Sequence, residues 1–118
     1  MPMALTIYHN PGCSKSRKTL ELIREHGIEP KIVEYLKEPP QAATTLQIAA
    51  WLGVGVADLL RTTDADESDE TLSLNDDALA HWLQDHPSAL QRPIVVDEKH
   101  ARACIGRPPE NVLKLLNA

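Results

Sequence analysis

Apolar residues alternate with polar ones in two short segments near the start of the chain, and a segment with helical spacing lies between them. Residues 5–8 alternate as a half-buried strand does, and residues 31–35 form a second candidate strand. The intervening residues are rich in helix formers, with Leu20 and Ile23 on one face and Gly27 as the expected stop. Because a helix separates the two strands, we expect them to be parallel, in a βαβ unit.

A group of helices is predicted after Pro39-Pro40, which closes this unit. A helix over residues 41–52 is expected to place three apolar side chains on one side: Leu46, Ala49 and Ala50. Residues 56–61 predict a short second helix. Asn75 is a suitable N-cap for a helix over residues 76–85, whose buried face is expected to carry Leu79, Trp82 and Leu83.

The last part of the chain predicts two strands and a terminal helix. Pro93 precedes the apolar residues 94–96, and residues 103–105 are expected to return antiparallel after a turn. Pro108-Pro109 then starts a helix that buries Val112, Leu115 and Leu116.

Together these elements predict an α/β fold of the type βαβ…ββα, with a mixed sheet. At 118 residues the chain has the size of one domain, so we expect a single domain over residues 1–118 with a helical insertion at about residues 37–91. There is no apolar run as long as a membrane span and no signal-peptide pattern at the start. These observations argue against a membrane protein and favour the cytoplasm.

The charge of the chain argues against nucleic acid as a partner. The formal net charge is −5, whereas binding to phosphate backbones requires a basic face. Residues 62–77 contain seven of the acidic residues and no Lys or Arg. This acidic segment has two interpretations, a solvated loop leading into a helix or a docking surface for a basic partner.

The two cysteines, Cys13 and Cys104, form neither a disulfide framework nor a metal-binding cluster. His81 and His86 lie five residues apart on a predicted helix and are interpreted as surface residues, so no metal site is expected. Cys104 lies in an apolar strand, where a cysteine usually serves packing. Redox or nucleophilic chemistry at one cysteine therefore fits better than structural crosslinking.

Cys13 is the best candidate for that chemistry. It follows a predicted strand and an Asn-Pro-Gly turn, and it stands where a helix begins, so unpaired backbone N–H groups and the positive end of the helix dipole surround it. Lys15, Arg17 and Lys18 add positive charge, and the first twenty residues contain no Asp or Glu. Each of these features favours the nucleophilic thiolate. The alternative is a small buried core cysteine.

The loop around this cysteine has the pattern His9-Asn10-Pro11-x-Cys13-Ser14-x-Ser16-Arg17. This pattern resembles the active-site loop of the glutaredoxin-linked arsenate reductases, a branch of the thioredoxin-like superfamily. Four later motifs extend the resemblance over nearly the whole chain: Tyr35-Leu36-Lys37-Glu38-Pro39-Pro40, Leu59-Leu60-Arg61, Gln91-Arg92-Pro93-Ile94-Val95-Val96 and Gly106-Arg107-Pro108-Pro109-Glu110. Because the sequence stops at Ala118, it is more similar to the short arsenate-reductase-like subgroup. The resemblance implies a thioredoxin-like fold.

The resemblance also implies an oxyanion site built from three arginines, because guanidinium groups match the oxygens of arsenate. The arginines at the matching positions are Arg61, Arg92 and Arg107. Pro93 would follow a cis peptide bond and would aim Arg92 into the pocket. Taken singly, each arginine has another interpretation, a charge at a helix end or a surface ion pair.

Two further side chains have roles implied by the resemblance. His9 would influence the thiol and the bound anion electrostatically; the alternative is a turn histidine bonded to nearby backbone. Ser16, like Ser14, can donate a hydrogen bond to a thiolate or oxyanion, and serine also caps helices. Ser16 stands where thioredoxins have the second cysteine of C-x-x-C, so no resolving thiol is expected there.

The implied activity is a monomeric arsenate reductase that depends on glutathione and glutaredoxin and binds no cofactor or metal. Cys13 would attack arsenate, glutathione as co-substrate would attack the resulting adduct, and glutaredoxin would remove the glutathione. Two alternatives remain open. One is a related thiol oxidoreductase acting on another oxyanion or on a glutathione-mixed substrate. The other is an Spx-like regulator that binds RNA polymerase, against which the absence of C-x-x-C argues.

Overall fold

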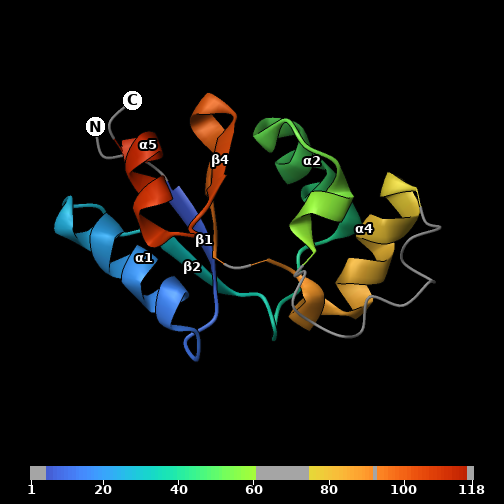
Figure 1. The fold of residues 1–118 in the computed structure, drawn as a ribbon, viewed down its shortest axis with the longest axis horizontal. Coiled ribbons are helices and arrows are strands. Elements are labelled where there is room, and N and C mark those ends of the chain that lie inside the picture. The colour runs from blue at the N-terminus through green and yellow to red at the C-terminus, as the bar shows by residue number, and fades with distance from the viewer. Residues whose placement is uncertain (1–4, 61–74, 92, 117–118) are drawn as a thin grey trace. The chain divides into compact units, whose positions relative to one another are not determined.

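The computed structural model describes residues 5–60, 75–91 and 93–116, and it divides the chain into two compact units (Figure 1). The first unit combines Met1–Glu38 with Arg92–Ala118, and the second is Pro39–Gln91. The second unit has nearly the bounds expected for the helical insertion. That both units make up one domain stays a prediction, and each unit is described here by itself.

The first unit is built on a four-stranded sheet, as the sequence predicted. The strands are β1 (Leu5–His9), β2 (Lys31–Glu34), β3 (Ile94–Asp97) and β4 (Arg102–Ile105). Their order is β2-β1-β3-β4. The β1–β2 pair is parallel, and β1–β3 and β3–β4 are antiparallel, which confirms both the βαβ unit and the returning strand.

One face of this sheet is covered by α1 (Ser14–Glu25) and by the C-terminal segment, where the 3-10 turn η4 (Pro109–Val112) runs into α5 (Leu113–Leu116). Figure 1 shows α1 and α5 on the same side of the strands. Seven buried apolar residues from these elements form the core between them: Leu5, Ile7, Leu20, Ile23, Val95, Val112 and Leu115. Removing this surface from water fixes α1 against the sheet.

Helix α1 ends where the sequence predicted. Gly27 follows the helix with a φ of 76°, in the left-handed region that glycine adopts without steric cost. Its N–H donates to the carbonyl oxygen of Arg24, which satisfies one of the last helical acceptors.

The second unit is helical. It contains α2 (Ala42–Leu52), the 3-10 turn η1 (Val56–Leu59), α4 (Asp76–Asp85) and the 3-10 turn η2 (Pro87–Ala89). The side chain of Asn75 accepts a hydrogen bond from the N–H of Ala78, which confirms it as the N-cap of α4. His81 and His86 are exposed, as expected.

The predicted faces of these helices need correction. In α2 the buried side chains are Ala42, Thr45, Ile48 and Ala49, and the expected Ala50 is exposed. The helix is apolar over most of its circumference, so its periodicity could not select one face. In α4 the third buried residue is Ala80, whereas Trp82 is only partly buried and stacks on His86 with ring centroids 4.2 Å apart.

Part of the acidic segment predicted over residues 62–77 lies outside the described residues. Within the described part, Asp76 and Asp77 occupy the first turn of α4, where negative charge interacts favourably with the helix dipole. Among the described residues, no helix combines the length and the apolar character needed to cross a bilayer.

A buried carboxylate joins the β3–β4 hairpin to α5. Asp97 is 1% exposed and accepts hydrogen bonds from His100 Nδ1 at 2.8 Å and from Arg102 Nη2 at 3.0 Å. The same Nη2 atom donates to the carbonyl oxygen of Leu115. Burial alone would raise the pKa of Asp97, but the bonds from Arg102 and His100 outweigh it and lower the pKa below its usual value.

We expect Asp97→Asn to lower the free energy of unfolding at pH 7 by about 1–2 kcal/mol, because Arg102 loses a charged acceptor. The lowered pKa of Asp97 means that its contribution is complete above the unfolded carboxyl pKa of about 3.9. This contribution is lost as the pH falls through the folded value. Urea denaturation from pH 7 to pH 2 should therefore show the wild type and the variant converging in acid. A difference that stays constant over that range would contradict this account.

Candidate active site

Cys13 stands at the junction between β1 and α1, as the N-cap residue of the helix. The turn before it is held by two hydrogen bonds: the Cys13 N–H donates to the carbonyl oxygen of Asn10 at 2.9 Å, and the Gly12 N–H donates to Asn10 Oδ1 at 2.9 Å. The Cys13 carbonyl oxygen in turn accepts from the Arg17 N–H at 3.0 Å, which begins the helix. Cys13 is partly exposed.

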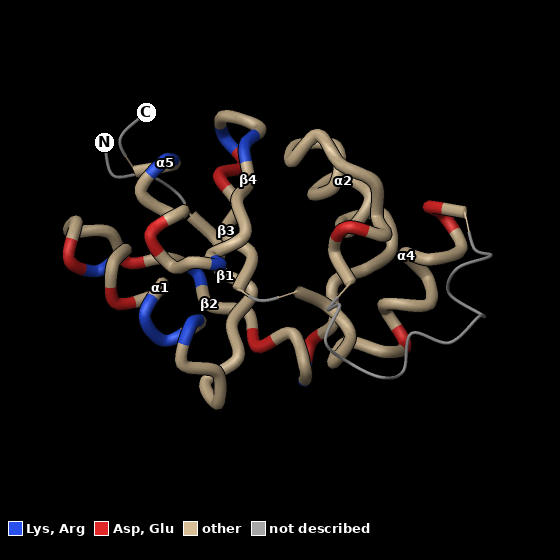
Figure 2. Tube along the Cα trace, viewed as in Figure 1, with Lys and Arg blue, Asp and Glu red and all other residues tan. Residues whose placement is uncertain are grey.

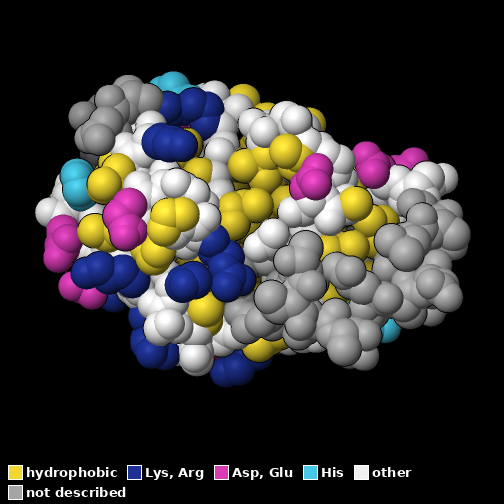
Figure 3. Space-filling view, viewed as in Figure 1, with side chains coloured by type: hydrophobic (Ala, Val, Ile, Leu, Met, Phe, Trp, Pro, Cys, Tyr) yellow, Lys and Arg dark blue, Asp and Glu magenta, His cyan; other side chains and the backbone are white. Residues whose placement is uncertain are grey.

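The first turns of α1 carry basic residues, at a position where acidic residues usually stabilise a helix. No Asp or Glu lies in the first turn, and Lys15, Arg17 and Lys18 are exposed there. Figure 2 shows Lys and Arg along the N-terminal half of α1, and the side chains appear as dark blue patches in Figure 3. These cations add to the positive end of the helix dipole rather than neutralise it. The arrangement favours an anion, either a thiolate at Cys13 or a bound oxyanion.

His9 and Ser16 form a buried pair beneath this turn. His9 is 6% exposed and Ser16 is fully buried, and the distance from His9 Nδ1 to Ser16 Oγ is 2.6 Å. The same hydroxyl oxygen accepts the N–H of Asn10 at 3.0 Å. The bond between Nδ1 and this hydroxyl joins the end of β1 to the first turn of α1. Nδ1 of His9 therefore bonds to a side chain. A direct contact between Ser16 and substrate stays a prediction.

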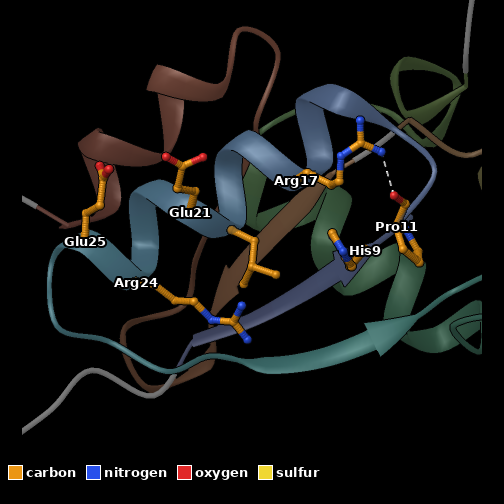
Figure 4. Close-up of a pocket in the computed structure, with 7 residues that line it drawn as sticks. His9, Pro11, Arg17, Glu21, Arg24 and Glu25 are labelled. Carbon is orange, nitrogen blue, oxygen red and sulfur yellow. Dashed lines mark hydrogen bonds between the residues drawn. The ribbon is translucent and has the colours of Figure 1, made fainter.

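The surroundings of His9 favour its neutral form. Burial is the largest cause that lowers the pKa of His9, and the positive charges of Arg24 and Arg17 lower it further, against an opposing effect of Glu34. His9 lines an open pocket of about 580 Å³ together with residues of α1. In Figure 4 the Arg17 guanidinium points to Pro11, whose carbonyl oxygen it contacts at 2.7 Å. Arg17 is thus held beside the turn.

Pro93 and Arg107 come from the C-terminal part of the same unit. Because Tyr8 pairs with Ile94, the register continued by one step places Pro93 opposite His9. Pro93 is buried, and its carbonyl oxygen accepts the N–H of Gly106 at 2.9 Å, which brings the residue before Arg107 to this end of the sheet. Arg107 is partly exposed. Its peptide bond to Pro108 is cis, a feature that the sequence analysis did not anticipate.

The other two predicted arginines, Arg61 and Arg92, lie outside the described residues, and so does the predicted cis bond before Pro93. The described residues that precede these two arginines are paired with each other through the backbone. Leu60 forms a β-bridge with Leu90, and the N–H of Gln91 donates to the carbonyl oxygen of Leu59 at 2.7 Å.

Cys104, the other cysteine, is also partly exposed but lies within the sheet. It lies in β4 opposite Val95 and packs against the core cluster beneath α1. Burial raises the pKa of its thiol to about 12. A thiol of this kind is protonated at neutral pH and is a poor nucleophile, as expected for a packing residue. Within the described stretches, no three His, Cys, Asp or Glu side chains are grouped closely enough to bind a metal ion.

This arrangement of a sheet, a cysteine at a helix start and a basic first turn agrees with the family comparison. Residues 8–115 match the model of the ArsC family. The chain belongs to the ArsC family. The family comparison and the solved structures agree on a thioredoxin-like fold, as the sequence predicted.

Three similar proteins illustrate the range of the family. The chain is 43% identical over 120 residues to uncharacterized protein YfgD of Escherichia coli strain K12, covering 98% of this chain and 99% of that protein. It is also 43% identical over 117 residues to the arsenate reductase of the same strain, covering 95% of this chain and 80% of the reductase. The solved structure of an arsenate reductase from Vibrio cholerae superposes with a TM-score of 0.88 at 38% identity, covering 97% of this chain and 98% of that one.

The two thiols should differ in reactivity. At pH 7 iodoacetamide should label Cys13 and leave Cys104 unlabelled in the folded protein, because burial keeps the Cys104 thiol protonated. The midpoint of the Cys13 labelling rate against pH should lie below the value of about 8.5 for an ordinary cysteine. Mass spectrometry of digested protein measures both sites, with labelling in urea as the control in which both react. Equal labelling of the folded protein would contradict the assignment.

Proposed function

We propose that this protein is an arsenate reductase that uses Cys13 as its nucleophile. The observation that carries the proposal is the position of Cys13 at the N-terminus of α1, where a basic first turn supports a thiolate beside a bound anion. The relatives named arsenate reductase share 43% identity over 95% of the chain, and this similarity supports arsenate as the oxyanion. We expect the protein to work as a monomer in the cytoplasm, where glutathione is abundant.

The proposed reaction begins when the Cys13 thiolate attacks arsenic, forms a sulfur–arsenic bond and displaces water from the protonated arsenate. Reduction to arsenite then requires two electrons, which two thiols supply when they form a disulfide. Cys13 provides one thiol and glutathione, as co-substrate, provides the other. Glutaredoxin then reduces the Cys13–glutathione disulfide and restores the thiolate.

The structure of the turn supports an external second thiol. Ser16, at the position of a second C-x-x-C cysteine, has its hydroxyl engaged by His9 and by the N–H of Asn10. Cys104 is partly buried, and burial raises the pKa of its thiol to about 12, so the thiol is protonated at neutral pH. The neutral imidazole of His9 lies beneath the turn, where it holds Ser16 and shapes the electrostatic environment of Cys13. We assign to His9 this influence on the thiol and the anion.

The oxyanion is proposed to bind to Arg61, Arg92 and Arg107, with the first turn of α1 beside it. Guanidinium groups can donate two parallel hydrogen bonds to a tetrahedral oxyanion, which distinguishes them from lysine. Gly106 brings the chain at Arg107 against Pro93, which supports a place for Arg107 near His9 and Cys13.

A coupled assay tests the proposal directly. With glutathione, glutathione reductase and glutaredoxin present, NADPH consumption should depend on arsenate, and Cys13→Ser should abolish it. Cys104→Ser is the matched control and should retain most of the activity, since Cys104 is a packing residue. Intact oxidised protein should carry glutathione on Cys13. Arsenate-independent consumption, or an intramolecular Cys13–Cys104 disulfide with activity lost in Cys104→Ser, would overturn the mechanism.

The three arginines should contribute through binding to the ligand rather than through the fold. Replacing Arg61, Arg92 or Arg107 by Ala should lower kcat/KM for arsenate by about tenfold or more, while the unfolding midpoint changes little. Lysine at each position should restore activity only in part, because it lacks the planar pair of donors. Steady-state kinetics and urea denaturation of the six variants measure both effects. Wild-type turnover in all three alanine variants would show that the assigned pocket is wrong.

A further inference from the structure

The loop that carries Arg107 is fixed by contacts that the proposed chemistry does not use. On one side, an ideal Cβ at Gly106 would come within 2.5 Å of Thr19 Oγ1 and 2.8 Å of Pro93 Cγ. Such distances are far below van der Waals contact, so only glycine fits at this position. The backbone before Arg107 is therefore pressed against α1 and against the residue opposite His9.

Thr19 is itself fixed in α1. It is fully buried, and its hydroxyl donates to the carbonyl oxygen of Lys15 at 2.8 Å, one turn earlier in the helix. Lys15 lies in the first turn, two residues after the N-cap residue Cys13. The contact between Gly106 and Thr19 thus ties the Arg107 loop to the same helical turns that surround the candidate nucleophile.

On its other side, the loop is held by Asn111. The side-chain nitrogen Nδ2 of Asn111 donates to the carbonyl oxygen of Ile105 at 3.3 Å and to that of Arg107 at 3.2 Å. Both partners are carbonyl oxygens, so only the amide nitrogen of Asn111 can serve them, and the orientation of the amide is determined. The two bonds enclose Gly106 and the backbone of Arg107.

We propose that Asn111 is a positioning residue for oxyanion binding, which holds the Arg107 loop closed against Thr19 through the carbonyl oxygens of Ile105 and Arg107. Asn111 does not contact the anion. Its two donors and the close contact at Gly106 restrict the backbone from opposite sides, so the Arg107 side chain extends from a backbone held in one position. This inference rests on the proposed role of Arg107 in binding arsenate.

A structural role alone would have a different signature. Asn111 lies in η4, which packs on α1, so removing its hydrogen bonds will also lower stability to some extent. Loss of stability alone does not change the affinity of the molecules that remain folded. A positioning role changes the affinity for the oxyanion, and it does so only while Arg107 is present to be positioned.

Two variants of similar shape remove the donors: Asn111→Leu and Asn111→Asp. Each should raise KM for arsenate by about five- to tenfold, with kcat changed less than about twofold. A readout without turnover is the protection of Cys13 from iodoacetamide by arsenate or by inorganic phosphate. The concentration that gives half-protection should rise by the same factor as KM. Arg107→Ala should show the larger shift, and Asn111→Leu combined with Arg107→Ala should shift no further than Arg107→Ala alone.

The matched control is Arg102→Met, at the opposite end of β4. Arg102 joins Asp97 to Leu115, so this variant should be destabilised in the same unit while KM and half-protection stay at wild-type values. Wild-type affinity in both Asn111 variants would overturn the inference. So would a shift that persists undiminished in the Arg107→Ala background. Failure of the proposed function would be seen separately, in the wild-type protein: arsenate would neither protect Cys13 from iodoacetamide nor support turnover.

Discussion

The site depends on the packing of α1 against the sheet, because this contact fixes the position and direction of the helix start. Leu20 and Ile23 bury one face of the helix against β1 and β3. Once the helix axis is fixed, the N-terminal end of α1 lies beside the end of β1, where the chain turns through Pro11 and Gly12. The packing of residues two and three turns further along the helix therefore places the positive end of the helix dipole at Cys13.

The basic first turn of α1 acts against the stability of the helix. Cations near a helix N-terminus interact unfavourably with the dipole, by an amount on the order of 0.3–1 kcal/mol each when exposed. Acidic residues that suit such a position occur in the first turn of α4, where Asn75 also provides a cap. The same chain thus contains a helix start optimised for stability and one whose charges favour a bound anion. Conflicts of this kind between local rules and observed residues are typical of functional sites.

Much of the fold could be predicted from the sequence because the strands and helix stops have strong local signals. The four strands, the αL glycine after α1 and the cap at Asn75 follow from alternation, glycine and capping chemistry. The buried face of α2 could not be predicted, because Ala and Leu surround most of the helix and tertiary packing alone selects Ile48 over Ala50.

The candidate site was predictable only in part, because its contacts join residues distant along the chain. Cys13 was identified from its local context, and the roles of His9 and Arg107 came from the family resemblance. The bond between His9 and Ser16 requires the strand and the helix to be folded back on each other, and the bonds of Asn111 require the turn after β4.

The sequence does contain a signal for the close packing of the turn after β4. A glycine between an apolar strand and two prolines can indicate a backbone that approaches a neighbour too closely for a side chain, as Gly106 does at Thr19 and Pro93. Asn111 holds the same stretch of backbone from its other side, through the carbonyl oxygens of Ile105 and Arg107.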